Sequence, residues 1–357
     1  MDPRLVALVD DLPAWLLPGG PEADVVVASR VRLARNLAGR PFPAQLDGPA
    51  AREICRTARE RLCGSIRPEC LVLEPNGLGQ PDQDLLVERS LASRDLLQAP
   101  RPTLILFNRE ESLGLLVNEE DHFRLQAFAA GSNLAMALRC IRPLALELGR
   151  CFELARSPRF GWLTACPTNT GTGLRASLLL HLPALARARV PLQRMLQTAA
   201  KSFLAVRGVH GEGSRALGHF YQISNQRTLG SQISQQVRAV EEFGEEVARY
   251  EREVRQALLR DEASRRSLID DLEAAHHRLA TAEGIDTASA LDALSTLRLG
   301  VLCGLAEELG LGLDPDRLLV NSFQIQPGHL QARLRADLAP DQRDEHRARL
   351  LRDSLGL

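Results

Sequence analysis

The hydrophobic pattern of this 357-residue chain changes character at about residue 231, and that change constrains the fold more than any other feature. Before it, helical patterns alternate with short β-branched or aliphatic runs at 24–29, 103–107, 114–118 and 160–165,. The two clearest helical patterns there span 50–62 and 191–204, the second with Pro191 at an expected N1 position,. After the change the chain has helical spacing almost throughout, at 232–283, 287–309, 328–337 and 341–355,.

This pattern predicts an α/β (α+β) domain followed by an all-helical domain. We place an N-terminal segment at 1–22, the α/β domain at 23–240 and the helical domain at 241–357. Each of the two domains is long enough to bury a core of its own.

The overall composition excludes several classes of protein. The net charge is −1, so there is no bulk electrostatic case for binding nucleic acid or a membrane,. Seven cysteines, an odd number without a CxxC pair, favour a reduced chain over a disulfide framework or a zinc site,. The N-terminus lacks the pattern of a signal peptide, and no apolar run approaches the length of a membrane span,. We therefore expect a cytoplasmic protein.

Basic residues are almost all arginine, because Lys201 is the only lysine among 44 basic residues. A Walker A loop needs a lysine after its glycines, and a protein kinase needs a strand lysine with HRD and DFG motifs; neither pattern is present,. A chain like this that handles nucleotide phosphates must use guanidinium groups, which bind phosphate oxygens bidentately. Codon usage in a GC-rich genome is the simpler cause of the bias itself.

Acidic residues are missing from a long internal stretch. Between Glu153 and Glu212 lie 58 positions without a carboxylate, where the average of the chain predicts about seven,. The stretch keeps seven arginines and Lys201. Such a segment suits a cradle for a polyanion, although a chance gap in a buried region has the same appearance.

Two short motifs combine charges at a spacing that favours ligand binding. In the run 29–36, Arg30 and Arg32 lie two apart on an expected strand, so their side chains share one face,. In the run 118–124, Glu119, Glu120 and Asp121 precede Arg124 at the end of an apolar strand. Neighbouring carboxylates of this kind bind Mg²⁺ or a cationic substrate. Surface salt bridges and a solvated acidic turn are the alternatives.

Two loop motifs follow. The run CPTNTGTGLRAS at 166–177 comes after an expected strand and leads into a helical pattern; its glycines allow backbone to approach a ligand,. It also matches GxGxxA, but the acidic ribose partner of a dinucleotide site cannot exist in the acid-free stretch,. The run RGVHGEGS at 207–214 joins an arginine, glycines and a carboxylate, as in a loop that closes on substrate,.

Taken together and in this order, these fragments resemble the phosphagen (guanidino) kinase superfamily over about residues 24–230. Within it they are most similar to the bacterial protein arginine kinases of the McsB type. The resemblance is carried by SRVRLARN, VNEEDHFRLQ, FGWLTACPTNTGTGLRASLLLHLPAL and RGVHGEGSRALGHFYQISNQRTLG. It implies an antiparallel sheet flanked by helices, the phosphagen kinase and glutamine synthetase-like fold, and it implies that ATP with Mg²⁺ phosphorylates a guanidinium.

The resemblance also assigns roles to residues. It implies that the ATP phosphates are held by Arg30, Arg32, Arg124, Arg175 and Arg207. It implies further nucleotide contacts at Ser29, Ala176, Ser177, Leu178, Leu179, Gly208, Val209, His210 and Gly211. Glu120 and Glu212 match the two carboxylates that hold the substrate guanidinium, and Cys166 matches the active-site cysteine. Glu119 is our candidate for Mg²⁺, through water. Ser90 stands where the family commonly has histidine, which puts one nucleotide contact in doubt.

The substrate is inferred from the two ends of the sequence. Small-molecule phosphagen kinases carry a helical domain ahead of the SxRxR strand, whereas Ser29 lies near the start here and the helical domain follows. An uncovered site suits arginine displayed on a protein. In the run 343–348, Arg343, Asp344, Arg347 and Ala348 match the RDxxRA motif, which in the resembled family forms an allosteric phosphoarginine pocket. A solvated charged helix face is the alternative.

We therefore predict an ATP-dependent protein arginine kinase that marks proteins for Clp-type degradation. Its expected partners are proteins with exposed arginine, an activator protein, a Clp-type unfoldase and a second copy of the chain. The alternatives are a kinase of small guanidino compounds, or an adaptor that reads phosphoarginine.

Overall fold

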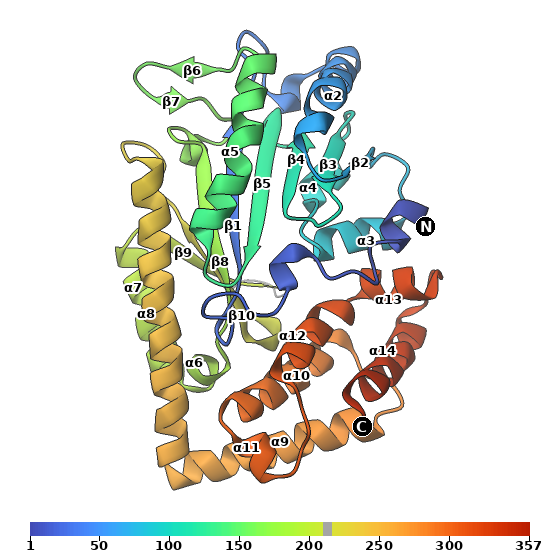
Figure 1. The fold of residues 1–357 in the computed structure, drawn as a ribbon, viewed down its shortest axis with the longest axis vertical. Coiled ribbons are helices and arrows are strands. Elements are labelled where there is room, and N and C mark those ends of the chain that lie inside the picture. Colours follow the sequence, from blue (N-terminus) through green and yellow to red (C-terminus); the bar gives the residue numbers. More distant parts are fainter. Residues whose placement is uncertain (210–215) are drawn as a thin grey trace.

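An antiparallel sheet of eight strands forms the centre of the computed structural model, which describes residues 1–209 and 216–357 (Figure 1). In their order across the sheet the strands are β2 (Cys70–Leu73), β3 (Leu104–Asn108), β4 (Leu113–Val117), β5 (Phe123–Ala130), β1 (Val26–Arg35), β8 (Leu174–His181), β10 (Phe220–Asn225) and β9 (Leu204–Gly208). A separate two-stranded sheet joins β6 (Arg156–Ser157) to β7 (Gly161–Trp162). The sheet is antiparallel as predicted, because every one of its neighbouring pairs runs in opposite directions.

The helices fall into two groups. Those before residue 261 are α1 (Pro3–Val6), α2 (Gly48–Leu62), α3 (Gln80–Glu88), α4 (Arg94–Leu97), α5 (Leu134–Cys151), α6 (Pro183–Arg187), α7 (Arg189–Lys201) and α8 (Ile233–Arg260). The later ones, here called the helical region, are α9 (Glu262–Thr281), α10 (Thr287–Leu302), α11 (Leu305–Glu308), α12 (Pro315–Gln324), α13 (Pro327–Leu334) and α14 (Pro340–Leu355). Short 3₁₀ turns include η1 (Ala14–Leu16) and η5 (Leu217–His219). Within the described ranges, none of these helices has the length and apolar content needed to cross a bilayer.

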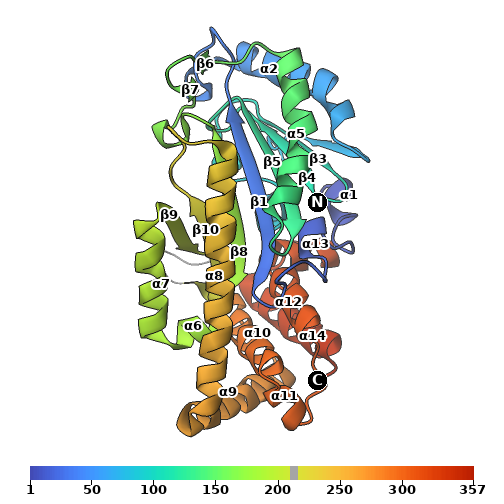
Figure 2. The same cartoon turned by 60° about the vertical axis from the view of Figure 1, so that its left-hand side comes forward.

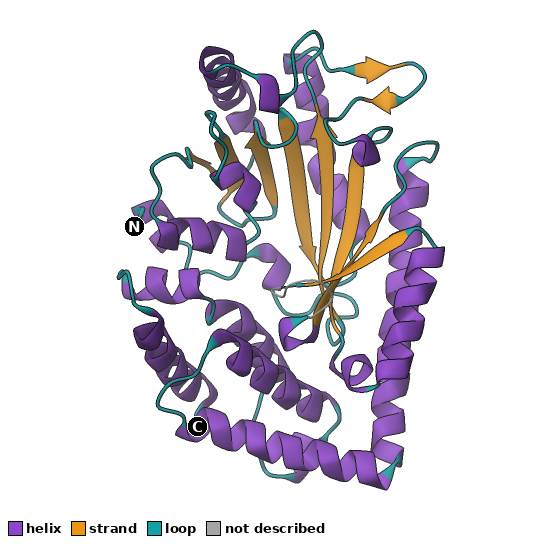
Figure 3. Ribbon diagram, turned by 180° about the vertical axis from the view of Figure 1, so that it is seen from behind, coloured by secondary structure: helices purple, strands orange, loops and turns teal. Residues whose placement is uncertain are grey.

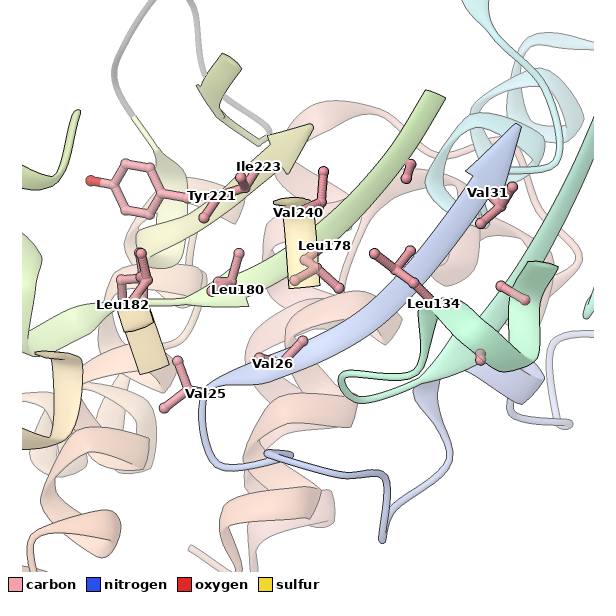
Figure 4. Packing of buried hydrophobic residues seen from close by; sticks show 14 of the residues in the cluster. Val25, Val26, Val31, Leu134, Leu178, Leu180, Leu182, Tyr221, Ile223 and Val240 are labelled. Atoms are coloured by element: carbon pink, nitrogen blue, oxygen red, sulfur yellow. The ribbon is translucent and has the colours of Figure 1, made fainter. Parts of the chain in front are cut away.

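One face of the sheet is buried beneath α5 and α8, which lie along it (Figure 2). Val31 of β1, Leu178 of β8 and Ile223 of β10 are fully buried on this face, close to Leu134 of α5 and Val240 of α8 (Figure 4). Helix α8 approaches closely because it has glycine at position 244: a Cβ there would lie 2.2 Å from a methyl carbon of Leu178.

The opposite face of the sheet is only partly covered. Over β3 and β4 it packs against α1, α3 and α13. Over most of β1, β8 and β10 none of the described helices covers it, and Figure 3 shows these strands from that side. Arg30 and Arg32 of β1, Arg175 and Ser177 of β8, and Gln222 and Ser224 of β10 point to this face, because strand side chains alternate and Val31, Leu178 and Ile223 point to α5 and α8,.

The helical region is joined to the sheet by a buried arginine. Arg298 of α10 is 2% exposed, and its guanidinium donates to the carbonyl oxygens of Ala23 (2.9 Å), Asp24 (3.1 Å) and Pro315 (3.2 Å). It also lies 2.8 Å from Nδ1 of His181, at the end of β8. Residues that precede β1 and the first turn of α12 are thus held by one side chain.

Several predicted elements need correction. The predicted helix at 232–283 is two helices, because the backbone of Asp261 is extended and its carboxylate accepts from the Ser264 amide (2.9 Å) as the N-cap of α9,. The predicted helix at 287–309 is interrupted at Gly304, whose φ is +78°. Pro191 is the third residue of α7 rather than the first. Helix α12 had no predicted counterpart.

The segment after Gly173 was also predicted wrongly. It begins β8, although it was expected to lead into a helix. Its leucines have good helix propensity, but the strand lies between β1 and β10, where pairing on both sides outweighs that preference,. Of the predicted strand at 160–165, only Gly161 and Trp162 pair.

Candidate active site

Strand register places all five predicted phosphate-binding arginines on the open face of the sheet. Residues directly opposite each other in an antiparallel pair point to the same side. The pairs that settle the face are Ala34 with Arg124, Arg32 with Arg175, Arg30 with Ser177, Ser177 with Ser224, and Gln222 with both Leu179 and Arg207. The five arginines, here called the arginine row, therefore share the open face of the sheet and come from β5, β1, β8 and β9.

The arginine row is electrostatically unfavourable without an anion. Arg32 and Arg175 are direct cross-strand neighbours of like charge,. Burial, together with the guanidinium groups of Arg30, Arg124 and Arg175, lowers the pKa of Arg32 well below its usual range. Burial and Arg124 lower the pKa of Arg30 to about 10. The Nε atoms of Arg30 and Arg32 are buried and have no hydrogen-bond partner among the described residues, so the row is short of acceptors.

Carboxylates meet the row at its β5 end. Arg124 forms an ion pair with Glu119, and its second amino group lies 2.9 Å from the carboxylate of Glu120. Glu119 is buried, and Ser93 also donates to it. Glu120 is 42% exposed at its side chain, and partial burial raises its pKa despite the attraction of Arg124. Glu120 is exposed and lies beside Arg124, one of the predicted phosphate ligands. Its carboxylate can therefore bind a second cation as well.

A polar cavity of about 830 Å³ lies over the row. Its lining includes Arg32, Arg124, Arg175 and Arg207 together with Glu119, Glu120 and Cys166. The thiol of Cys166 lies 3.0 Å from the hydroxyl of Thr168, which lines the same cavity. We call this space the phosphate cavity. It brings predicted phosphate ligands, a predicted substrate carboxylate and the predicted cysteine into one volume.

A second, more apolar cavity of about 590 Å³ adjoins the first, with Gln222 in the wall of both. Four predicted nucleotide contacts line it: Arg30, Ser177, Leu179 and Val209. Ser90, the position where the family commonly has histidine, lines it as well. Its volume is in the usual range for a ligand pocket. We call it the base cavity.

Other predicted nucleotide contacts lie elsewhere. Ser29 is fully buried; its hydroxyl donates to the Gly131 carbonyl (2.7 Å) and accepts from the Asn133 amide (2.7 Å), so it holds the turn before α5. Ala176 and Leu178 are buried on the opposite face of β8, and Gly208 lines neither cavity as the described residues bound them. His210, Gly211 and Glu212 lie outside the described residues.

The glycines of the 166–177 loop allow close backbone contacts within the protein, and Gly173 also lines the phosphate cavity. A Cβ on Gly171 would lie 2.4 Å from the Thr228 carbonyl oxygen, and one on Gly173 would lie 2.6 Å from that of Ala34. Both have positive φ, +119° and +61°,. The loop is thereby pressed against β1, and this position brings Arg175 next to Arg32.

The acid-free stretch forms a cradle only in part. Of its basic residues, Arg175 and Arg207 line the phosphate cavity. Arg156 lies over the ring of Trp162, Arg159 over that of Phe160, and Arg187 pairs with Asp271.

The 343–348 motif lies on α14. Arg347 is 1% exposed, and it donates to the carbonyls of Ile325 (3.0 Å) and Ile285 (2.7 Å) and to the carboxylate of Asp344 (2.5 Å). Arg343 and Asp344 are half-buried, and Ala348 is buried. Arg347 and Asp344 thus already bind each other in the protein without a ligand.

Sequence reasoning missed the residues that close the base cavity from outside the motifs. They are Trp15, Val87, Glu88, Arg94, Phe128 and Phe323. Only Phe128 carried a signal, since it follows Arg124 and Gln126 at the period of two that faces the site,.

Comparison with known proteins identifies the class. Residues 52–254 match the family model described as ATP:guanido phosphotransferase, C-terminal catalytic domain, and residues 265–357 match the Protein-arginine kinase McsB C-terminal domain. Two solved structures share the fold. That of lombricine kinase has a TM-score of 0.57 and 22% sequence identity, and the match covers 70% of this chain and 71% of that one. That of the duplicated taurocyamine kinase from Schistosoma mansoni with transition state analog components has a TM-score of 0.59 and 24% identity, and the match covers 79% of this chain and 40% of that one. Fold and site thus define a guanidino phosphotransferase.

Relatives of similar length narrow the class. The protein-arginine kinase of Shouchella clausii is 37% identical over 348 residues, which cover 96% of this chain and 95% of that one. That of Brevibacillus brevis is 36% identical over 350 residues, covering 96% and 94%. The chain belongs to the protein-arginine kinase family, as the sequence motifs predicted.

Proposed function

We propose that this chain transfers the γ-phosphoryl group of ATP to the guanidinium group of arginine side chains in proteins. The observation that carries the proposal is the arginine row, four members of which, all but Arg30, line one cavity together with Glu120 and Cys166. Membership of the protein-arginine kinase family supports the choice of protein arginine over a small guanidino compound.

In this proposal ATP spans the two cavities. The triphosphate lies on the arginine row, where it supplies the acceptors that the buried guanidinium groups lack,. The nucleoside enters the base cavity, between the apolar side chains of Leu179 and Phe128. Gln222, in the wall of both cavities, lies where the two parts of the nucleotide join.

The substrate guanidinium is held opposite the γ-phosphate. Glu120, with Glu212 as predicted from the motif, binds it and aligns one nitrogen with phosphorus. That nitrogen forms the N–P bond as the bond from phosphorus to the bridging oxygen of ADP breaks, and its proton passes to a carboxylate. Because the transition state of phosphoryl transfer is loose, positioning and charge stabilisation by the arginine row account for most of the catalysis.

Magnesium is expected to arrive with the nucleotide. The described residues contain no cluster of three or more metal-ligating side chains. Mg²⁺ needs only one or two carboxylates when phosphates and water complete its shell, and Glu119 fits that limited role at the edge of the phosphate cavity,. Bound there, the ion would neutralise charge on the phosphate oxygens.

The test is to incubate the protein with ATP and Mg²⁺ and either an unfolded arginine-rich protein or free arginine, and to follow products by phosphorus NMR without acid. We expect a phosphoramidate signal on the protein substrate. Glu120→Gln should abolish it, whereas Glu110→Gln, a change at an exposed carboxylate away from the cavities, should not. Acid-stable phosphate on serine, threonine or tyrosine would contradict the proposal, and a signal with free arginine alone would favour a small-molecule kinase.

Marking for Clp-type degradation, an activator protein, a homodimer through the helical region and phosphoarginine binding at 343–348 stay predictions of the resemblance. The cytoplasmic location stays a prediction of the composition.

A further inference from the structure

The base cavity is built from three separate parts of the chain. Its floor comes from β1, β5 and β8, through Arg30, Phe128 and Leu179. Its outer wall includes Trp15, from the N-terminal segment, and Phe323, from α12 of the helical region. Phe323 lies within residues 265–357, which match the C-terminal family model. Phe128 and Leu179 of the floor lie within residues 52–254, which match the catalytic-domain model, and Arg30 precedes that range. Neither matched region contains the whole cavity.

Trp15 occupies an unusual position in this wall. It lies in η1, is 4% exposed, and its ring centroid is 6.5 Å from that of Phe128. Its indole N–H has no hydrogen-bond partner among the described residues. A buried donor without an acceptor is unfavourable, so within the described part of the chain it is packing that holds the ring beside the cavity,.

Phe323 connects the Trp15 ring to a buried apolar cluster that also contains Phe128, Phe220 and Leu319. Its ring contacts Trp15 edge to face, with centroids 5.1 Å apart, and lies 5.4 Å from the ring of Phe220 in β10. Leu319, one turn earlier on α12, is buried in the same cluster but does not line the base cavity. A flat aromatic base entering the cavity would therefore meet rings supplied by both ends of the chain.

We infer that Trp15 and Phe323 hold the base of the nucleotide, so that the N-terminal segment and the helical region complete the nucleoside site of the catalytic sheet. The inference rests on the proposed function for the presence of a nucleotide. It adds that the helical region binds the nucleotide directly, and that a bound base favours the docked position of α12.

A second contact at the same cavity points the same way. Glu88, at the end of α3, lines the base cavity, and its carboxylate accepts from the amides of Gly328 (2.7 Å) and His329 (2.9 Å) in the first turn of α13. A Cβ on Gly328 would lie 2.3 Å from the Leu85 amide, so α13 sits directly on α3. Two contacts of the helical region thus lie at the base cavity. One joins Phe323 of α12 to Trp15, and the other joins α13 to Glu88 of α3.

The first experiment uses Trp15 as its own probe. The chain has two tryptophans, and Trp162 lies outside both cavities, so Trp162→Phe leaves Trp15 as the single emitter. We expect ADP to change its fluorescence with a saturable dependence on concentration, and inorganic tripolyphosphate, which lacks a base, to leave it unchanged. Equal responses to both compounds, or none to ADP, would overturn the inference.

The second experiment separates base binding from folding. Phe323→Leu and Phe323→Ala should weaken ADP binding, by about tenfold for alanine, the loss typical of one aromatic contact with a base. Tripolyphosphate binding should not change. Leu319→Ala is the matched control, because it removes buried apolar volume from the same helix without touching the cavity, and it should leave the ADP affinity near that of the wild type.

Equal losses of ADP affinity in the alanine variants of Leu319 and Phe323 would show that α12 acts only through stability, and would contradict the inference. These measurements need no phosphoryl transfer. A protein that binds ADP through Trp15 but phosphorylates no arginine would therefore refute the proposed function and leave the inference standing.

Discussion

Arg32 shows how a single residue can favour binding at the expense of stability. It faces Arg175 across the β1–β8 pair, and its lowered pKa means that the folded protein holds this positive charge less readily than the unfolded chain does. The charged form of Arg32 therefore destabilises the free protein at neutral pH. An anionic ligand reverses the sign of that contribution.

We predict that Arg32→Met raises the unfolding temperature of the ligand-free protein by about 1–3 °C, because one cross-strand repulsion is lost while the aliphatic stem is kept. The same variant should gain much less stability from ATP than the wild type does. Thermal unfolding with and without ATP measures both effects. Arg56→Met, at an exposed arginine paired with Glu60, serves as control and should alter neither. A ligand-free variant less stable than the wild type would contradict the repulsion.

Glu120 predicts a pH dependence. Partial burial raises its pKa, so the carboxylate becomes protonated at a higher pH than an ordinary glutamate, whose pKa is about 4.3,. The ionised form is the one that binds a guanidinium, so kcat/KM should fall as the pH decreases through this raised pKa. A pH–rate profile checks the prediction. An acidic limb at or below the ordinary pKa would count against Glu120 as the titrating group.

At the scale of elements, α8 connects the covered face of the sheet to the strand that carries Arg207. Its buried Glu251 accepts from the amides of Ala184 and Leu185 (2.9 Å each), in the first turn of α6, and from Arg255 (3.2 Å). Helices α6 and α7 then lead into β9. One carboxylate of α8 thus fixes the start of the segment that ends at the phosphate cavity.

Glu251→Ala should lower the free energy of unfolding by about 2–4 kcal/mol, because it leaves two amides without their buried acceptor and Arg255 with Asp24 as its remaining ion-pair partner,. Glu253→Ala, on the same helix, removes an exposed carboxylate paired at 4.0 Å with Arg249 and should cost about 0.5 kcal/mol or less,. Urea unfolding of the two variants gives the comparison. Similar midpoints would mean that water replaces Glu251 at α6.

The same elements show what the sequence could predict. The period of two in β1 correctly predicted that Arg30 and Arg32 share a face, because strand geometry is local. The strand β8 was predicted as helix, because leucine propensity is local but pairing with β1 and β10 is not. The break at Asp261 had a local signal, an aspartate three residues before Ser264, which the apolar spacing concealed.

The base cavity could not have been assembled from sequence at all. Trp15 and Phe323 come from opposite ends of the chain, and nothing in their local surroundings relates one to the other. The motifs indicated the phosphate ligands because arginines that share a strand face repel one another unless an anion lies between them. An isolated aromatic residue usually belongs to the hydrophobic core. Trp15 and Phe323 are buried as core residues are, and they also line the base cavity.

At the scale of the molecule, Arg298 connects the helical region to the residues before β1, and the Trp15–Phe323 contact connects it to the N-terminal segment. We expect unfolding to be a single cooperative transition. Tryptophan fluorescence reports Trp15 and Trp162, and far-ultraviolet circular dichroism reports mainly the helices, so the two curves should coincide. Arg298→Met should move both curves together to lower denaturant concentration, since it leaves three part-buried carbonyls without this donor,. Separate transitions in the wild type would contradict this coupling.

The contact between Arg298 and the carbonyl of Asp24 spans 274 residues, and this has a consequence during synthesis. A ribosome adds about 5–20 residues per second, so the acceptors before β1 wait roughly 14 to 55 s for their donor to be made. Until then the carbonyls before β1 lack this donor, and the part of the base cavity's outer wall that Phe323 supplies is missing. A nascent chain therefore cannot form the part of the cavity wall that Phe323 supplies before α12 has been made, and fragments that end before α12 would lack it.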